Sequence, residues 1–301
     1  MSVSLKGILY ASVTAFLWGF LAIGLKVALS FLSPVSVACA RFSIAFFILL
    51  FYFLIFNRRG LSIIIKPPLF LIFAALCLGL NYFGFISGLK YTSPSISQIF
   101  IQIGPILLAI SGFILFKEKI NLRNITGILL VVGGLLVFYY EKLAFFSFKI
   151  NEYNKGIIWL IIGAIAWAGY AILQKQLVKK YSPATLNLVL FMIPAIILSP
   201  SVEYKTIFEL KLWHYILLLL LGLNTLVAYG CIALALKYIE ANKVSVIITL
   251  NPIITLITMA ILSNIHVKWI NPENFTFLIV IGASMVVIGA ILTIISSGKR
   301  T

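Results

Sequence analysis

Acidic residues are scarce in this sequence of 301 residues, which contains seven glutamates and no aspartate against 23 lysines and arginines. Each glutamate lies in a loop or at the end of an apolar segment, so no carboxylate is expected in the middle of a membrane. Proton relays and sites for lipophilic cations usually depend on such a group, because an unpaired charge in a low-dielectric medium costs several kcal/mol. Proton transfer through a buried Asp or Glu is therefore not expected, although a proton could move with bound water or with a ligand.

Charge of either sign is rare overall. Only 10% of the residues are charged and 62% are hydrophobic, whereas about a quarter of the residues in soluble proteins are charged. With a mean hydropathy of +1.16, this composition indicates a membrane protein. The net charge of +16 comes from basic residues in short gaps between apolar runs, which is a topological signal rather than a nucleic-acid patch. We expect the lipid bilayer, and no nucleic acid, as a partner.

Cysteine is also rare, and catalytic motifs are missing. The three cysteines, Cys39, Cys77 and Cys231, each lie alone in an apolar run, so they form neither a disulfide framework nor a zinc-binding pattern. His214 and His266 have no partner at metal-ligand spacing, and the sequence has no hydrolase, metalloprotease or phosphate-loop motif. The sequence therefore predicts no catalytic residue, no metal site and no cofactor, and it disfavours an enzyme.

Long apolar runs dominate what is present. Each run has roughly 18 to 25 residues, enough for a helix to cross about 30 Å of hydrocarbon. The runs lack the alternation of a membrane barrel, so they predict an all-α membrane protein without a soluble domain. Ten transmembrane helices are expected, at residues 7–29, 35–56, 69–89, 94–116, 123–140, 156–175, 183–200, 212–236, 243–262 and 275–296.

The sequence contains an internal repeat. Residues 89–105 read LKYTSPSISQIFIQIGP, and residues 236–252 read LKYIEANKVSVIITLNP, with the same first triplet and the same final proline. Residues of the first segment return 149 positions later, since Gly7, Trp18, Lys26 and Pro34 match Gly156, Trp167, Lys175 and Pro183. In the fifth and tenth segments, Gly127 and Gly134 match Gly282 and Gly289. A cleaved signal peptide would have no reason to copy a mature helix, so the first segment is expected to remain.

Two five-helix repeats follow from this pattern, residues 1–140 and 156–301, joined by a connecting loop at 141–155. Five is an odd number of crossings, so the second repeat enters the membrane from the opposite side. The repeats are then related by a pseudo-two-fold axis in the membrane plane. Two similar bundles of opposite orientation can exchange conformations, which predicts alternating access to a central site.

The distribution of basic residues predicts the orientation in the membrane. If the N-terminus is cytoplasmic, fourteen lysines and arginines lie in or beside the inner gaps and eight lie on the outer side. Arg41 is the remaining one and lies inside the second segment. We therefore expect a multi-pass protein of the cell inner membrane with both termini in the cytoplasm.

Several short motifs carry a resemblance to a known family. They are WGF and WAG in helices one and six, ARF in helix two, and LKY before a proline-containing helix in both halves. With ten helices in two inverted halves, the chain resembles the EamA-type permeases of the drug/metabolite transporter superfamily. The resemblance implies a central cavity lined mainly by helices one, three, four, six, eight and nine. It also implies transport of small metabolites such as amino acids, often outward.

The two halves differ at positions that matter for chemistry. Helix four ends in FKEKIN, which contains Glu118, whereas the corresponding place in the second half reads LSNIHV and has no acid. Arg41 has Leu190 at its repeat position. The small multidrug pumps of the same superfamily are similar in helix pattern but depend on a glutamate in the first helix, which is absent here. We therefore expect an asymmetric cavity with a different chemistry.

Polar and aromatic residues inside the helices are the candidates for substrate binding. Gln98 and Gln102 are four residues apart and share a helix face, and amides avoid lipid, so this face is expected to look into the bundle. The alternative role is hydrogen bonding between helices, worth about 0.6 kcal/mol per contact. The predicted substrate-binding residues are Trp18, Arg41, Asn81, Tyr82, Gln98, Gln102, Trp167, Tyr170, Asn224, Tyr229 and Asn251.

Arg41, Lys26 and Lys175 are basic residues that lie within apolar segments. Arg41 could hold a substrate carboxylate, or it could snorkel to the surface or bond carbonyls of a neighbouring helix. Lys26 and Lys175 lie about one turn from helix ends, where snorkelling is the expected role.

Two prolines and two glycines suggest where helices bend and touch. Pro105 and Pro252 lie near the middle of their segments, where each removes a backbone hydrogen bond and permits a kink. We expect both to act as hinges, and a fixed bend is the alternative. Gly84 and Gly88 form a small-residue face that predicts a close helix contact.

Together these features predict an integral-membrane secondary transporter that moves a small neutral or zwitterionic, amino-acid-like metabolite by alternating access, with export as the expected direction. A passive channel or facilitator also needs polar helix faces, and a flippase for lipid-linked substrates would need a lateral opening, so both are alternatives. The expected ligand is a small-molecule substrate, and the expected assembly is a monomer or homodimer.

Overall fold

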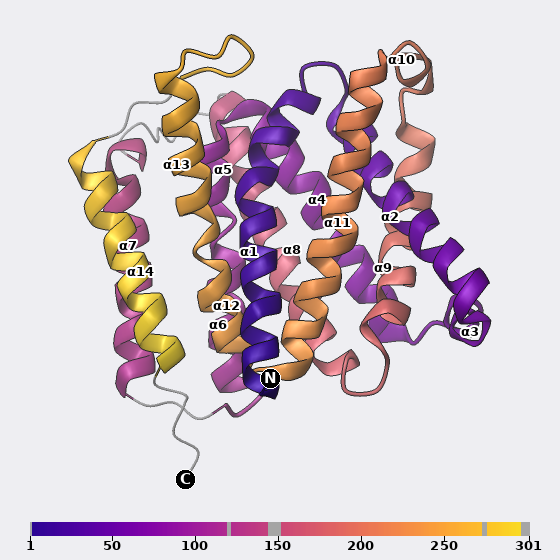
Figure 1. Cartoon of the computed structure of the whole chain (residues 1–301), viewed down its shortest axis with the longest axis horizontal. Coiled ribbons are helices and arrows are strands. Elements are labelled where there is room, and N and C mark those ends of the chain that lie inside the picture. Colours follow the sequence, from indigo (N-terminus) through magenta and orange to yellow (C-terminus); the bar gives the residue numbers. More distant parts are fainter. Residues whose placement is uncertain (1, 119–121, 144–151, 273–275, 296–301) are drawn as a thin grey trace.

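The computed structural model describes residues 2–118, 122–143, 152–272 and 276–295. Within these ranges the chain is helical and has no strand. The main helices, shown in Figure 1, are α1 (Val3–Ala28), α2 (Pro34–Phe56), α4 (Leu69–Tyr91), α5 (Pro94–Phe100), α6 (Ile103–Ile114), α7 (Leu122–Leu143), α8 (Glu152–Leu177), α9 (Pro183–Leu198), α11 (Leu212–Tyr238), α12 (Ala241–Ile248), α13 (Asn251–Asn264) and α14 (Phe277–Ile295). Loops add α3 (Ser62–Ile65), α10 (Tyr204–Phe208) and the 3-10 turns η1 (Arg58–Leu61) and η2 (Ser199–Ser201).

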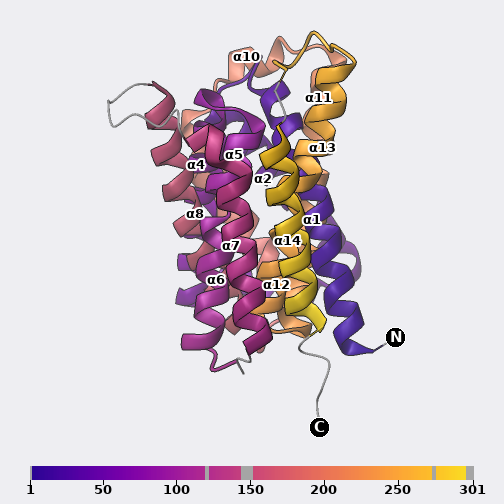
Figure 2. The same ribbon diagram turned by 90° about the vertical axis from the view of Figure 1, so that its left-hand side faces the viewer.

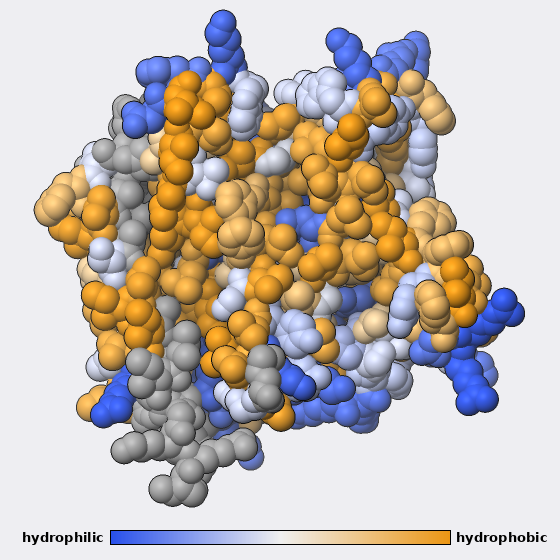
Figure 3. Space-filling model, viewed as in Figure 1, coloured by the Kyte–Doolittle hydropathy of each residue, from blue (hydrophilic) through white to orange (hydrophobic). Residues whose placement is uncertain are grey.

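The bundle has the surface of a membrane protein. Among the described residues, eight spans are long and apolar enough to cross a membrane, and α7 and α14 contain shorter apolar helices. Hydrophobic side chains cover the middle of the face in Figure 3, and hydrophilic ones gather at its top and bottom. Phe47, Phe51 and Phe56 are 62%, 66% and 73% exposed, which suits lipid rather than water. The predicted all-α fold with ten crossings is confirmed.

The two repeats have opposite directions. α1 begins and α14 ends at the lower end of the bundle in Figure 1, which we call the terminal end. α3 also lies at the terminal end, whereas α10 lies at the opposite end. Five crossings separate the start of α1 from the start of its repeat counterpart α8, so the two helices run in opposite directions, as an inverted repeat requires.

The fourth and ninth segments are broken helices, which corrects the expectation of one kinked helix in each. Residues 94–114 divide into α5 and α6, and residues 241–264 divide into α12 and α13. Proline has no backbone N–H and cannot donate a hydrogen bond to the carbonyl four residues earlier. The carbonyls without this donor are those of Ile101, before Pro105, and Ile248, before Pro252. Each break therefore precedes its proline, which lies in the first turn of the following helix, where no backbone donor is required.

Glycine pairs hold the halves together at close range. On α4, a Cβ at Gly84 would lie 2.7 Å from the carbonyl oxygen of Trp159 on α8, so the predicted close contact of this face is confirmed. The repeated glycines of α7 and α14 pack against each other, and Figure 2 shows these two helices side by side. A Cβ at Gly134 would lie 2.7 Å from the carbonyl oxygen of Gly282, and one at Gly289 would lie 2.5 Å from that of Gly127.

Lys26 and Lys175 do not snorkel. The Nζ atom of Lys26 donates to the carbonyl oxygens of Leu89 at 2.8 Å and Thr92 at 2.6 Å, at the C-terminus of α4. Lys175 makes the repeat-related contact at the end of α11, where Nζ donates to the carbonyl oxygens of Leu236, at 2.9 Å, and Ile239. The last carbonyls of a helix have no partner within it, so a nearby lysine binds them instead of reaching for water. This contact gives a physical role to the repeated LKY motif.

Candidate functional site

A small cavity of about 50 Å³ lies in the interior of the bundle, at the level of the two helix breaks. This space is enough for a few water molecules. Its walls come from α1, α2, α4, α5, α6, α8, α11, α12 and α13, through Trp18, Leu21, Arg41, Asn81, Tyr82, Phe85, Gln98, Ile101, Gln102, Pro105, Trp167, Tyr229, Ile248 and Asn251. Helices one, three, four, six, eight and nine of the transmembrane order contribute, as the family resemblance implies, and α2 adds Arg41.

Nine of the eleven predicted binding residues line this cavity, and two do not. Asn224 instead donates its Nδ2 hydrogen to the carbonyl oxygen of Leu17 at 2.9 Å, which ties α11 to α1. Tyr170 is fully buried behind the wall, and its ring centroid lies 5.6 Å from that of Tyr229 and 6.4 Å from that of Trp167. A role of any of the eleven in binding remains a prediction.

Among the described residues that line the cavity, Arg41 is the only charged one. It is 2% exposed, so the snorkelling alternative is wrong. Its Nε donates to Thr225 Oγ1 at 3.1 Å, its Nη2 donates to the Tyr82 hydroxyl at 3.4 Å, and its guanidinium lies 4.4 Å from the centre of the Tyr82 ring. Among the described residues no carboxylate pairs with it. Its repeat counterpart Leu190 is buried, so the cavity is asymmetric in charge.

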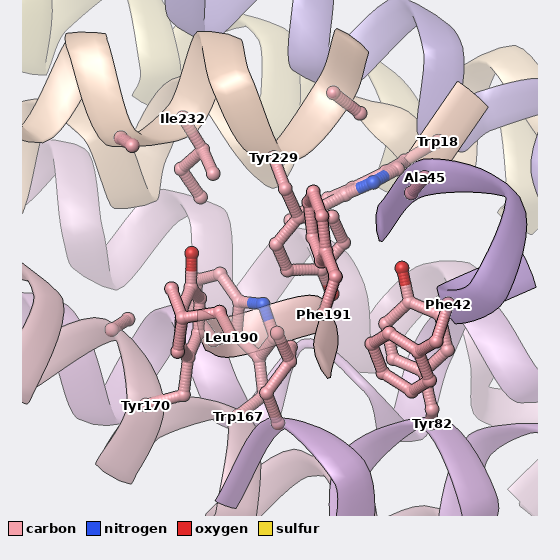
Figure 4. Close-up of a cluster of buried hydrophobic side chains, with 14 of the residues drawn as sticks. Trp18, Phe42, Ala45, Tyr82, Trp167, Tyr170, Leu190, Phe191, Tyr229 and Ile232 are labelled. Atoms are coloured by element: carbon pink, nitrogen blue, oxygen red, sulfur yellow. The ribbon is translucent and has the colours of Figure 1, made fainter. Parts of the chain in front are cut away.

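Aromatic rings from several helices gather in the interior of the bundle, and Figure 4 shows those of Trp18, Tyr82, Trp167 and Tyr229, which line the cavity. The indole of Trp18 meets that of Trp167 edge to face, with ring centroids 5.9 Å apart, and lies 5.4 Å from the ring of Tyr229. Phe42 packs on Tyr82 at 4.1 Å. Aromatic faces attract ammonium groups, so this lining can accept a cation as well as apolar atoms.

Four polar atoms in the wall have no hydrogen-bond partner among the described residues. The indole N–H groups of Trp18 and Trp167 are donors, and the Oε1 atoms of Gln98 and Gln102 are acceptors. The other ends of the two amides are fixed, because Gln98 Nε2 donates to the Trp18 carbonyl oxygen at 3.0 Å and Gln102 Nε2 donates to Asn251 Oδ1 at 2.7 Å. Buried polar atoms in native proteins normally have a partner, so these four are positioned for water or a ligand.

The wall contains groups that can contact either sign of charge. None of the lining residues within the described ranges is acidic, in agreement with the scarcity of glutamate in the spans. An anion can bind Arg41, because the N–H donors of its planar guanidinium match the two oxygens of a carboxylate. An ammonium group can meet the amide oxygens and the aromatic faces.

One contact of Arg41 and several apolar lining residues were not predicted from the sequence. Thr225 orients Arg41, and the lining residues Leu21, Phe85 and Ile101 are apolar. The helical period could have predicted these apolar lining residues. Leu21, for example, is three residues from Trp18, about one helical turn, so both lie on the same face of the helix. The hydroxyl of a threonine in a membrane helix usually donates to a backbone carbonyl of the same helix, as Thr225 Oγ1 does to the carbonyl oxygen of Leu221 at 3.0 Å. The additional contact of Thr225 with Arg41 therefore leaves no signal in the sequence.

Comparison with known proteins gives a consistent result. The model of the EamA-like transporter family matches residues 5–140 and again residues 154–295. The uncharacterized inner membrane transporter YhbE of Escherichia coli (strain K12) is 32% identical over 293 residues, which cover 96% of this chain and 91% of that protein. An uncharacterized transporter of Haemophilus influenzae is 32% identical over 299 residues, covering 97% and 95%. A solved crystal structure at 18% identity superposes with a TM-score of 0.70 over 95% of both chains and shows the same fold.

Proposed function

This chain belongs to the EamA-like transporter family, and we propose that it carries a small zwitterionic, amino-acid-like metabolite across the membrane by alternating access. The direction that we propose is export, as the family resemblance suggests. The single observation that carries the choice of substrate class is the buried, carboxylate-free environment of Arg41 in the cavity wall.

Arg41 needs a negative partner that the described protein does not supply. A buried charge is costly unless it is paired, and its two hydroxyl partners, Thr225 and Tyr82, are neutral. A substrate carboxylate would make a charge-assisted contact with the guanidinium. We therefore assign the substrate carboxylate to the Arg41 side of the cavity.

The ammonium group and the apolar atoms of the substrate would contact hydrogen-bond acceptors and aromatic rings. Gln98 Oε1 and Gln102 Oε1 lack partners among the described residues, and they can accept hydrogen bonds from a substrate ammonium group. The rings of Trp18 and Trp167 provide faces for the same group and contacts for apolar atoms. This arrangement supports a zwitterion over a simple anion or a simple amine, each of which would leave part of the wall unused.

The two broken helices are the proposed moving parts. The breaks before Pro105 and Pro252 lie at the level of the cavity, so each helix could bend there while its ends open or close. Broken helices from both inverted repeats around one site are a recurring arrangement in secondary transporters. We propose that Pro105 and Pro252 mark hinges, and that both chain termini lie in the cytoplasm.

The binding part of the proposal is tested by thermal stabilisation of the purified protein across a panel of amino acids and related metabolites. Each zwitterion is compared with its amine analogue, which lacks the carboxylate, and its acid analogue, which lacks the amine. A ligand at one hundred times its Kd stabilises by about 2.7 kcal/mol. We expect at least one zwitterion to raise the melting temperature and both of its single-charge analogues to fail.

Arg41→Gln supplies the matched test of the site. It should weaken binding of the stabilising zwitterion by about tenfold to a hundredfold, because one charge-assisted contact is lost. The ligand-free variant should keep its melting temperature, because an unpaired buried charge is removed. Arg59→Gln, at an exposed arginine outside the cavity, is the control and should bind normally. Stabilisation that survives in Arg41→Gln at unchanged affinity would rule out this assignment.

A further inference from the structure

Helix α8 carries buried polar groups from the cavity toward the terminal end. Trp167, Tyr170 and Gln174 occupy positions i, i+3 and i+7, so they share one face of the helix. Tyr170 and Gln174 are both 0% exposed. The hydroxyl of Tyr170 and both amide atoms of Gln174 have no hydrogen-bond partner among the described residues. The ring of Tyr170 packs against the cavity residue Tyr229, with centroids 5.6 Å apart, so this polar face starts at the cavity wall.

Helix α12 adds a further group of the same kind at the same end. Asn242 is 1% exposed, and neither of its side-chain amide atoms has a partner among the described residues. The two elements are joined next to these positions, because Lys175 donates to the carbonyl oxygen of Ile239 just before α12. Gln174 and Asn242 therefore both lie between the cavity and the terminal end.

The polar character of this face of α8 is not a requirement of the repeated fold. The interval of 149 residues relates Tyr170 to Leu21 and Gln174 to Leu25. The interval of 147 residues for α12 relates Asn242 to Ser95, which is buried and has a hydroxyl without a partner among the described residues. The corresponding face of α1 in the other half is thus apolar beyond Trp18, toward the end opposite the terminal end. Buried amides without partners destabilise a closed structure, and they are expected where water or a ligand enters in another conformation.

Glu118 connects the end of α6 to the start of α12. Its carboxylate follows α6 and accepts hydrogen bonds from the backbone N–H groups of Ala241, at 2.6 Å, and Asn242, at 3.1 Å, in the first turn of α12. A negative charge at a helix N-terminus is favourable. Gly112 leaves room for the carboxylate, because a Cβ there would lie 2.5 Å from Glu118 Oε2. The corresponding stretch at the opposite end, residues 262–267, contains no acidic residue that could make this contact.

We propose that Tyr170, Gln174 and Asn242 wall the closed half of the substrate path between the cavity and the terminal end, and that Glu118 is the latch that holds this half shut. The assignment of the path to a substrate rests on the proposed function, whereas the latch does not. Separation of α6 from α12 would break both contacts of Glu118 and admit water to the three unpartnered side chains. The path is then asymmetric, with a carboxylate latch at one end and none at the repeat-related place.

Thiol labelling tests the latch without knowledge of the substrate. Gln174→Cys is placed in a protein whose cysteines, Cys39, Cys77 and Cys231, are replaced by alanine, and a membrane-impermeant methanethiosulfonate is added on the side of the terminal end. We expect slow labelling with Glu118 intact and labelling about tenfold faster with Glu118→Ala, because charge-assisted hydrogen bonds are lost. Glu118→Gln keeps an acceptor oxygen without the charge and should give an intermediate rate.

Leu25→Cys is the matched control, because it occupies the repeat-related position and is also fully buried. With reagent on the opposite side, its labelling should not accelerate in Glu118→Ala. Equal acceleration at both positions would mean general loosening of the bundle, and no acceleration at position 174 would mean that Glu118 is not a latch; either result overturns the proposal. If the latch behaves as expected but no zwitterion of the panel changes labelling or melting temperature, the proposed function fails and the latch stands.

Discussion

Gln102 on the break between α5 and α6 donates its Nε2 hydrogen to Oδ1 of Asn251, the first residue of α13, at 2.7 Å. The contact joins the two broken helices, one from each repeat, at the points where they are interrupted. Both residues also line the cavity. A ligand that competes for either amide would therefore disturb the connection between the two halves, which couples occupancy of the site to the arrangement of the broken helices.

Gln102→Ala and Asn251→Ala are expected to impair transport more than expression. A hydrogen bond between membrane helices contributes about 0.6 kcal/mol, so each variant should fold, while loss of a polar contact to substrate should lower the transport rate about tenfold. In the double variant the effects should be less than additive, because the two side chains share one interaction. Transport by both single variants at the level of the parent protein would show that the site is misplaced.

Lys26→Met is expected to lower the free energy of unfolding by about 1–3 kcal/mol, because carbonyl oxygens at the end of α4 lose their donor. Lys175→Met should have a similar effect at the end of α11. Lys6→Met, at an exposed lysine of α1, is the control and should change stability by less than about 0.5 kcal/mol. Thermal unfolding in detergent measures all three, and equal stability of Lys26→Met and Lys6→Met would refute the capping role.

Gly134→Ala and Gly133→Ala form a pair of neighbouring substitutions with opposite expectations. A Cβ at position 134 would meet the backbone oxygen of Gly282 at 2.7 Å, so α7 and α14 must separate, at a cost of about 1–3 kcal/mol. At position 133 the nearest atom is Met285 Cε at 3.6 Å, so alanine fits and can stabilise the helix by up to about 1 kcal/mol. Melting temperatures that fall equally for both would contradict the packing described here.

Reporter fusions at the two termini test the orientation. α1 begins and α14 ends at the same end of the bundle, and the bias of basic residues favours the cytoplasm for that end. Fluorescent fusions, which require the cytoplasm, should be active at both ends of the chain, and alkaline phosphatase fusions, which require export, should be inactive at both. Opposite activities at the two termini are incompatible with ten crossings.

Much of the fold follows from the sequence because bilayer thickness and backbone hydrogen bonding leave few choices for long apolar runs. The repeat of Trp18 as Trp167 indicates the inversion, since it reveals an odd number of crossings in each half. The breaks were less predictable. Pro105 and Pro252 mark the bend, but the residue at which the helix ends depends on side chains such as Gln102 that bridge to the other half.

The polar residues of the site were also visible in the sequence, because amides and a lone arginine in apolar segments must face the bundle interior. Their partners were not. Lys26 was expected at the surface, since its distance from the helix end does not reveal the carbonyls of another helix nearby. Asn224 and Tyr170 are polar residues inside apolar segments, as several lining residues are, so the sequence does not distinguish them. Only the packing of the helices shows that they lie outside the cavity wall.

Counterflow in proteoliposomes tests the central claim most directly, namely that a zwitterion binds at Arg41 and crosses by alternating access. Vesicles loaded with the stabilising zwitterion should take up the labelled compound faster than empty vesicles, and uptake should saturate. Arg41→Gln should lower kcat/KM by about tenfold to a hundredfold, while Arg59→Gln should not. Uptake that rises linearly with concentration, without stimulation by internal ligand or dependence on Arg41, would contradict the account.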